Sequence, residues 1–176
     1  MVSTDMAKLI TEEIASRSRS LDFSWSGLLL PNPDPILRMQ GQHMRVYRDL
    51  RADAHVGGCI RRRKSAVAAL EAGIDRRLAP ARVAKSVEAM LADLPMDRIV
   101  GEATDAALYG FQPMEVMWAA RGAQWVPEDV VGKPAEWFAF DTDNRLRFLS
   151  REQMLQGEEI PDRKFLLPRQ EPTYLN

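Results

Sequence analysis

The stretch ALYGFQPMEVMW, residues 107–118, marks the point where the sequence pattern changes from helical to extended. Before Gly110, apolar residues recur every three or four positions, as in a helix, and glycine commonly follows a helix end. After it, the apolar residues Met114, Val116 and Trp118 take every second position, which is the period of a β-strand. The chain is therefore expected to form helices first and strands second, an α+β fold.

The helices expected before Gly110 combine an apolar face with a residue that favours a helix start. They cover approximately residues 4–15, 34–50, 54–70, 80–94 and 97–109. Between the first two, the serine- and proline-rich residues 16–35 are expected to form an extended arm that is anchored by apolar side chains. After the third helix, residues 70–74 are expected to turn into a strand.

The strands expected after Gly110 are short and separated by turn residues. They cover residues 111–118, 124–126, 136–140, 145–148 and 164–167, with turns at Arg121-Gly122 and at the DTDN segment, residues 141–144. Strands joined by such turns run antiparallel. Two regions are thus expected: the N-terminal helix and extended arm at residues 1–35, and a mixed domain at residues 36–176 whose β-rich part is mainly antiparallel.

The composition is that of a folded protein, with 45% hydrophobic and 28% charged residues among 176. Lys and Arg number 24 and Asp and Glu 25, so no global charge draws the chain to nucleic acid or membrane. The single cysteine excludes an internal disulfide framework. No signal peptide is recognisable, and the longest aliphatic cluster, Leu28 to Leu30, is far too short to span a bilayer. A cytosolic protein without a membrane anchor is expected.

The segment DAHVGGCIRRRKSAV, residues 53–67, carries the most conspicuous chemistry of the chain. On a helical wheel its apolar residues form one stripe, which should pack against the protein. The stripe consists of Val56, Cys59, Ile60, Val67 and Leu70, and Arg61, Arg62, Lys64 and Ser65 lie outside it. Arg63 lies inside the stripe and is expected to extend to solvent or to pair with a carboxylate of the same chain, in preference to the alternative of facing another subunit.

Metal binding and cysteine catalysis are both disfavoured for this segment. His55 and Cys59 lie on one helix face, but a structural zinc site needs four ligands, and His43 is the one further histidine. Cys59 lies on the apolar stripe, so it is expected to be a small buried hydrophobe and not a reactive thiolate.

Phosphate and calcium loops are absent as sequence motifs. Gly57-Gly58 fits neither the Walker pattern nor the dinucleotide fingerprint, and Gly132-Lys133 is followed by a proline. The DTDNRL segment lacks the glycine of a calcium loop. Carboxylates lie at scattered spacings, so no active site, cofactor or metal is expected.

The cations Arg61, Arg62, Arg63 and Lys64 could contact phosphates. No recognised nucleic-acid-binding pattern accompanies them, and a run of this length is usually a solvated helix face. A nucleic-acid-binding module that uses Arg61 to Lys64 is therefore the alternative function, and it predicts DNA affinity that falls steeply with salt.

Several stretches of the chain, in matching order, resemble the Mu-like bacteriophage portal protein family. The first is LPNPDPILRMQGQHMRVYRDLRADAHVGGCIRRRKSAVAALE, Leu30 to Glu71; the second is ALYGFQPMEVMW, Ala107 to Trp118, which has the family's LYG-x-x-P-x-E-V-x-W pattern. The third is VVGKPAEWFAFDTDNRLRF, Val130 to Phe148, with RKFLLPRQEPTY, Arg163 to Tyr174.

This resemblance implies a structural role in a phage or prophage. Portal proteins form a ring, usually dodecameric, at one capsid vertex; terminase pumps double-stranded DNA through it, and head-completion or tail proteins attach to it. The ATPase belongs to terminase, so no enzyme activity is implied. Residues 36–176 resemble the portal wing, truncated before the stem, clip and crown. The implied location is the bacterial cytoplasm during assembly and then the virion, and Arg61, Arg62, Arg63 and Lys64 become candidate contacts to DNA or a neighbouring subunit.

Overall fold

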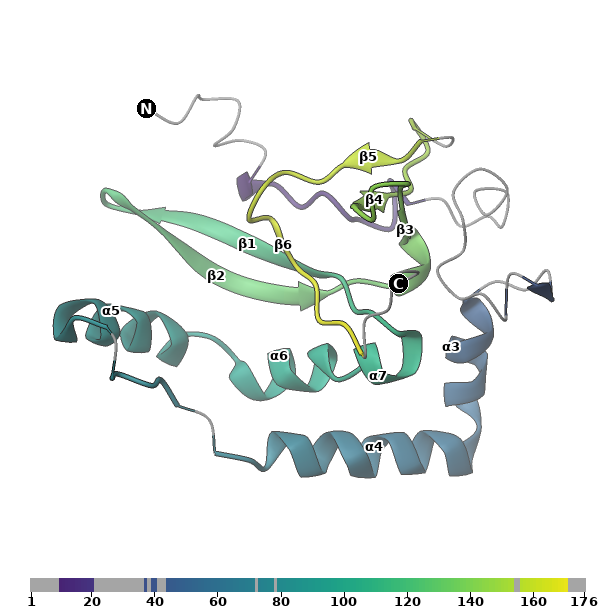
Figure 1. Cartoon of the computed structure of the whole chain (residues 1–176), viewed down its shortest axis with the longest axis horizontal. Helices are drawn as coiled ribbons and strands as arrows, with labels where there is room; N and C mark the ends of the chain where they lie inside the picture. The colour runs from purple at the N-terminus through teal and green to yellow at the C-terminus, as the bar shows by residue number, and fades with distance from the viewer. Residues whose placement is uncertain are drawn as a thin grey trace.

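The computed structural model describes residues 10–20, 37, 39–40, 44–71, 73–77, 79–153 and 156–170, and it confirms the α+β fold (Figure 1). The helices are α3 (Arg45–Ala52), α4 (Ala54–Ala68), α5 (Ala81–Ala92), α6 (Met96–Ala103) and α7 (Ala106–Tyr109). The strands are β1 (Met114–Arg121), β2 (Gln124–Gly132), β3 (Phe138–Phe140), β4 (Leu146–Phe148), β5 (Glu158–Glu159) and β6 (Phe165–Leu166). A 3-10 turn, Ala135–Trp137, precedes β3.

The strands form two antiparallel three-stranded sheets. One has the order β2-β1-β6 and the other the order β3-β4-β5. Gly110 ends α7 with a φ of 80°, a left-handed conformation that glycine adopts at little cost. Gly122 turns β1 into β2 with a φ of 64°. The helix end, both hairpin turns and the antiparallel pairing are therefore confirmed.

One expected helix and one expected strand are wrong. The helix expected at residues 97–109 is interrupted at Thr104 and Asp105, which separate α6 from α7. The strand expected at residues 70–74 does not form in the described residues of that segment.

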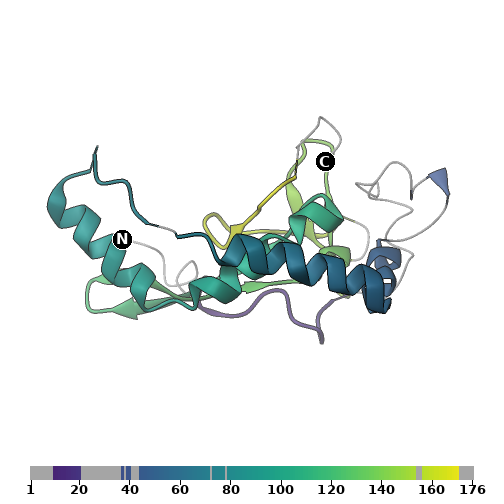
Figure 2. The same ribbon diagram turned by 90° about the horizontal axis from the view of Figure 1, so that it is seen from below.

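The β1–β2 hairpin is covered on one face by α5 and α6. Ile99 of α6 and the preceding Leu94 pack against Met114, Val116 and Val130 of the hairpin. Figure 1 shows α5 and α6 below the hairpin and the N-terminal segment above it, so both faces of β1 are covered. The molecule is elongated, with α5 near one end and α3 near the other, and α4 lies against α6 (Figures 1 and 2).

A second core joins the two sheets through aromatic side chains. Phe111 packs edge-on to Phe140, with ring centroids 4.9 Å apart, and Phe138 contacts both Phe148 and Phe165. Ile14 of the N-terminal segment is buried in the same cluster. Segments far apart in the sequence therefore share one core.

The N-terminal segment differs from the helix expected at residues 4–15. Residues 4–9 lie outside the described part of the chain, and the helix ends at Thr11. From there the segment runs to Ser20, which forms an antiparallel bridge with Ser150. Most of the expected arm and the start of the second expected helix, together residues 21–36, also lie outside the described residues.

A buried ionic cluster fixes this segment to β1. The carboxylate of Glu115 is fully buried and accepts hydrogen bonds from the backbone N–H groups of Ile14 and Ala15. The ammonium groups of Lys133 and Lys164 each lie 3.3 Å from a Glu115 oxygen. A charged group buried without partners would be strongly unfavourable, so these contacts stabilise one another.

The cluster is electrically balanced by a second carboxylate, because Lys133 also pairs with Glu13. Lys164 donates to the carbonyl oxygens of Ile10 (2.9 Å) and Val116 (3.1 Å). Burial lowers the pKa of the Lys164 ammonium, and the charge of Glu115 opposes this only in part.

Asp141 organises the turn between β3 and β4. Its carboxylate accepts hydrogen bonds from the N–H groups of Asp143 (3.0 Å) and Arg145 (2.8 Å) and from the Arg147 side chain (2.9 Å). Burial acts to raise the pKa of Asp141, but these hydrogen bonds and the charge of Arg147 outweigh it, so the pKa lies below its ordinary value of 3.8.

Replacing Asp141 with asparagine is expected to lower the free energy of unfolding by about 1–2 kcal/mol at neutral pH. A depressed folded-state pKa gives stability that is complete above the unfolded pKa of 3.8 and is lost as pH falls through the folded pKa. The gap between wild type and Asp141→Asn, measured by urea unfolding at several pH values, should therefore narrow below pH 3.8. Asp143→Asn, an exposed change in the same turn, is the control; a gap that stays constant with pH would contradict the assignment.

In the described part of the chain, no helix has the length and apolar character to cross a membrane.

Candidate functional site on helix α4

Helix α4 begins at a side-chain cap. The Asp53 carboxylate accepts 2.9 Å hydrogen bonds from the N–H groups of His55 and Val56, which have no partner inside the helix. One turn later, a Cβ atom built on Gly57 would lie 2.6 Å from the Arg51 carbonyl oxygen of α3. Only glycine allows this close approach of the two helices.

Lys64 does not extend into solvent; it ties α4 to the rest of the protein. Its ammonium lies 2.8 Å from the Asp105 carboxylate, which precedes α7. The same carboxylate lies 3.4 Å from the guanidinium of Arg51 on α3. Burial alone would lower the pKa of Arg51, but a hydrogen bond with Tyr109 and the charge of Asp105 raise it above its ordinary value. Arg51 stays charged, and Asp105 joins three helices.

The apolar stripe expected to pack α4 against the protein is largely exposed. Leu70 is 71% exposed and Val67 40%, and Val56 is also exposed. The expectation that Cys59 is a buried hydrophobe is wrong, because its side chain is exposed. Gly57 is the one buried residue of α4, and Lys64 of this helix pairs with Asp105, so an ion pair holds the helix where apolar burial was expected.

The arginines Arg61, Arg62 and Arg63 are all exposed. Within the described residues, none of them forms an ion pair with a carboxylate, although a pair was one of the two expectations for Arg63. The four-residue basic run is therefore divided: Lys64 is structural, whereas the three arginines are exposed, and Arg61 also lines a hollow beside Arg51.

His55 and Cys59 lie close together, with Nε2 and Sγ 4.0 Å apart. His43 lies outside the described residues. In the part of the chain that the structure describes, no group of three or more His, Cys, Asp or Glu side chains converges as a metal site would require.

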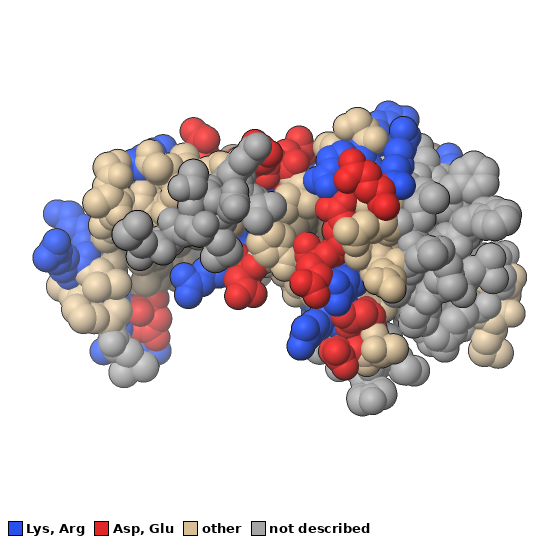
Figure 3. Space-filling view, turned by 90° about the horizontal axis from the view of Figure 1, so that it is seen from above, with Lys and Arg blue, Asp and Glu red and all other residues tan. Residues whose placement is uncertain are grey.

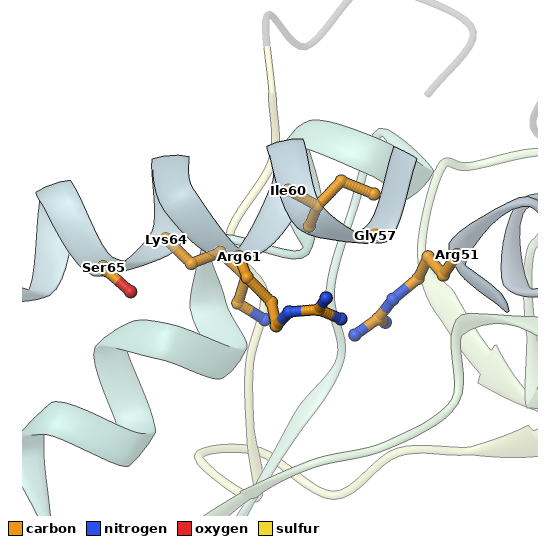
Figure 4. A pocket seen from close by; sticks show the side chains of 6 residues that line it. All are labelled: Arg51, Gly57, Ile60, Arg61, Lys64 and Ser65. Atoms are coloured by element: carbon orange, nitrogen blue, oxygen red, sulfur yellow. The ribbon is translucent and has the colours of Figure 1, made fainter. Parts of the chain in front are cut away.

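A hollow of about 340 Å³ lies under α4, and the sequence alone did not indicate it. It is lined by Arg51, Gly57, Ile60, Arg61, Lys64 and Ser65. In Figure 4 the guanidinium groups of Arg51 and Arg61 point toward each other from the two helices. Arg51 could not be assigned to this site from the sequence, because it precedes Arg61 by ten positions. The tight turn between α3 and α4 brings it close to the basic run.

The opposite side of the molecule has a different charge pattern. Figure 3 views the face that carries the N-terminal segment, and on its described part basic and acidic side chains are interspersed. Opposite charges also pair in the segments that lie above the hairpin in Figure 1: Arg19 of the N-terminal segment with Glu158 of β5 (2.7 Å), and Arg147 of β4 with Glu159 of β5 (3.0 Å). The described part of that face therefore does not carry an electrostatic potential of one sign.

Comparison with known proteins connects these features to a family. None of the curated proteins compared matches the chain. The sequence model of the family described as "Portal protein of Mu bacteriophage" matches residues 44–176, which include α3, α4, both sheets and the Asp105 junction. Because this match spans most of the chain, the resemblance found in the sequence is confirmed, and the chain belongs to the Mu bacteriophage portal protein family, a structural phage family.

Proposed function

We propose that the chain is the wing-like part of a portal subunit that assembles with its copies into a ring, usually dodecameric in such proteins, at one capsid vertex. DNA would be packaged through this ring by terminase, and capsid, head-completion and tail proteins would bind to it. The protein would assemble in the bacterial cytoplasm and remain in the virion. The family match over residues 44–176 is the observation that carries the proposal.

The surface of α4 supports an assembly role. Its exposed Val56 and Val67 lie on the same helix as three exposed arginines, and the helix is held by contacts with Asp53 and Asp105. Exposed apolar residues flanked by charges are typical of surfaces that another macromolecule covers. A neighbouring subunit or the DNA backbone is the partner that the proposal assigns to Arg61, Arg62 and Arg63.

The proposal is tested with the reading frame expressed through its natural stop codon. Light scattering would give the mass of the assembly, and particle imaging would show its shape. Closed rings with a central channel are the expected result. A protein that remains a monomer in both measurements would count against the proposal.

Charge reversal at Arg61 and Arg62 is expected to reduce ring formation or packaging and to leave the fold intact. Both side chains are exposed and neither forms an ion pair with a described residue, so Arg61→Glu with Arg62→Glu removes no internal contact that the structure shows. Thermal unfolding should stay within a few degrees of wild type while the ring fraction falls by about tenfold or more. A variant that unfolds outright would contradict the placement of these arginines on the surface.

The nucleic-acid-binding module remains a second candidate, because Arg61, Arg62 and Arg63 are exposed and form no ion pair with a described residue. For each phosphate neutralised in duplex DNA, the logarithm of affinity should fall with the logarithm of salt concentration by a slope of about 0.9. A monomer that binds duplex DNA with a slope of about two to three would favour this candidate over the ring.

A further inference from the structure

We propose that the hollow between α3 and α4 binds a phosphate-class oxyanion, with Arg61, Arg51 and Lys64 as its cationic ligands. The inference concerns this pocket alone and does not depend on ring formation. The ligand group is a phosphate, either of a free anion such as pyrophosphate or of a DNA backbone.

The charges around the hollow are unbalanced. Arg51, Arg61 and Lys64 line it, and the Asp105 carboxylate pairs with two of them, at 3.4 Å from Arg51 and 2.8 Å from Lys64. Arg61 forms no ion pair with a described residue. Three cations thus share one carboxylate, and a bound dianion would neutralise the excess.

The backbone geometry gathers these cations at one point. Arg61 Nη1 would lie 3.3 Å from a Cβ atom on Gly57, so the absence of that atom leaves room for the guanidinium to lie across the helix. Figure 4 shows that guanidinium pointing toward Arg51, with Lys64 on the same side of α4. Two guanidinium groups that face each other repel, and an oxyanion between them would turn the repulsion into a pair of bidentate contacts.

The lining also limits the class of ligand. The volume of about 340 Å³ is at the lower end of the range for small-molecule sites. Among the described residues that line the hollow, Ile60 is the one large apolar side chain, and none carries an aromatic ring on which a base could stack. The Ser65 hydroxyl adds a donor for an oxygen atom. The pocket is therefore suited to a phosphate group and not to a nucleobase.

The test is calorimetric titration of sodium pyrophosphate into the full chain and into two matched variants. Arg61→Gln removes a ligand, whereas Arg62→Gln removes the same charge from the next residue of α4, which is also exposed but is not among the residues that line the hollow. Wild type should bind pyrophosphate, Arg61→Gln about tenfold more weakly or worse, and Arg62→Gln within about twofold of wild type. Circular dichroism without the anion should be the same for all three proteins.

Two outcomes would overturn the proposal. In the first, the wild-type protein binds no pyrophosphate. In the second, the affinities of the two variants fall equally, which would indicate diffuse charge attraction without a defined site.

A competition experiment then identifies the source of the phosphate. Duplex DNA that displaces pyrophosphate from wild type, and does so poorly from Arg61→Gln, supports a backbone phosphate; pyrophosphate that stays bound in excess DNA supports a free anion. Because this readout needs no assembled ring, failure of the ring experiment would leave it unaffected.

Discussion

Replacing Glu115 with glutamine is expected to lower the free energy of unfolding by about 3–5 kcal/mol, because it removes one partner of a buried ionic cluster. The carboxylate is fully buried and neutralises Lys164, which is also fully buried. A neutral amide could still accept a hydrogen bond from the N–H of Ile14 or Ala15, but it would leave two ammonium groups, Lys133 and Lys164, opposed by Glu13 alone. Urea unfolding followed by circular dichroism measures the loss.

The matched control is Glu159→Gln on β5. Its carboxylate lies 3.0 Å from Arg147, but the side chain is 77% exposed, so the same chemical change there should cost less than about 0.5 kcal/mol. If the two variants lose similar stability, the cluster around Glu115 is not the ionic anchor described above.

The local elements were largely predictable from the sequence, because each depends on residues close together in the chain. The two-residue period from Met114 predicted β1, and Gly110 predicted the end of the helix before it. The role of Glu115 was not predictable. In a strand with one solvent-exposed face, the Glu115 side chain would point to solvent. It is buried here because a segment about 100 positions earlier in the chain covers that face of β1. The residues next to Glu115 in the sequence do not indicate that such a distant segment will cover it.

For helix α4, the sequence predicted the position of the helix but not its orientation. Its position was predicted well, because Asp53 is a good cap and helix-forming residues follow. Its orientation was not, because the apolar stripe was assigned to the protein core, yet Val67 and Leu70 are exposed. The contact that orients the helix is an ion pair between Lys64 and Asp105, 41 positions apart, and a charged run gives no indication of which member is paired. The arginines of the candidate site were therefore located, whereas Arg51 and the hollow were not.

Replacing Phe148 with alanine is expected to lower the free energy of unfolding by about 3–5 kcal/mol. The ring is fully buried, its centroid lies 5.6 Å from that of Phe138, and the Arg19 guanidinium lies 5.8 Å from its centre. The cavity would form where the second sheet meets the N-terminal segment, so amide hydrogen exchange at residues 14–20 should also accelerate. The control is Leu166→Ala on β6, which is 49% exposed and should cost about 1 kcal/mol or less.

Exchange at residues 14–20 also separates the two ways in which the N-terminal segment is held. Glu115→Gln removes its ionic attachment and leaves the aromatic core, whereas Phe148→Ala opens the core and leaves the carboxylate bonds to Ile14 and Ala15. If the segment is held cooperatively, either change should release all of it, including the Ser20 bridge to Ser150. Faster exchange confined to residues 14 and 15 in one variant and to residues 19 and 20 in the other would instead mean two independent attachments.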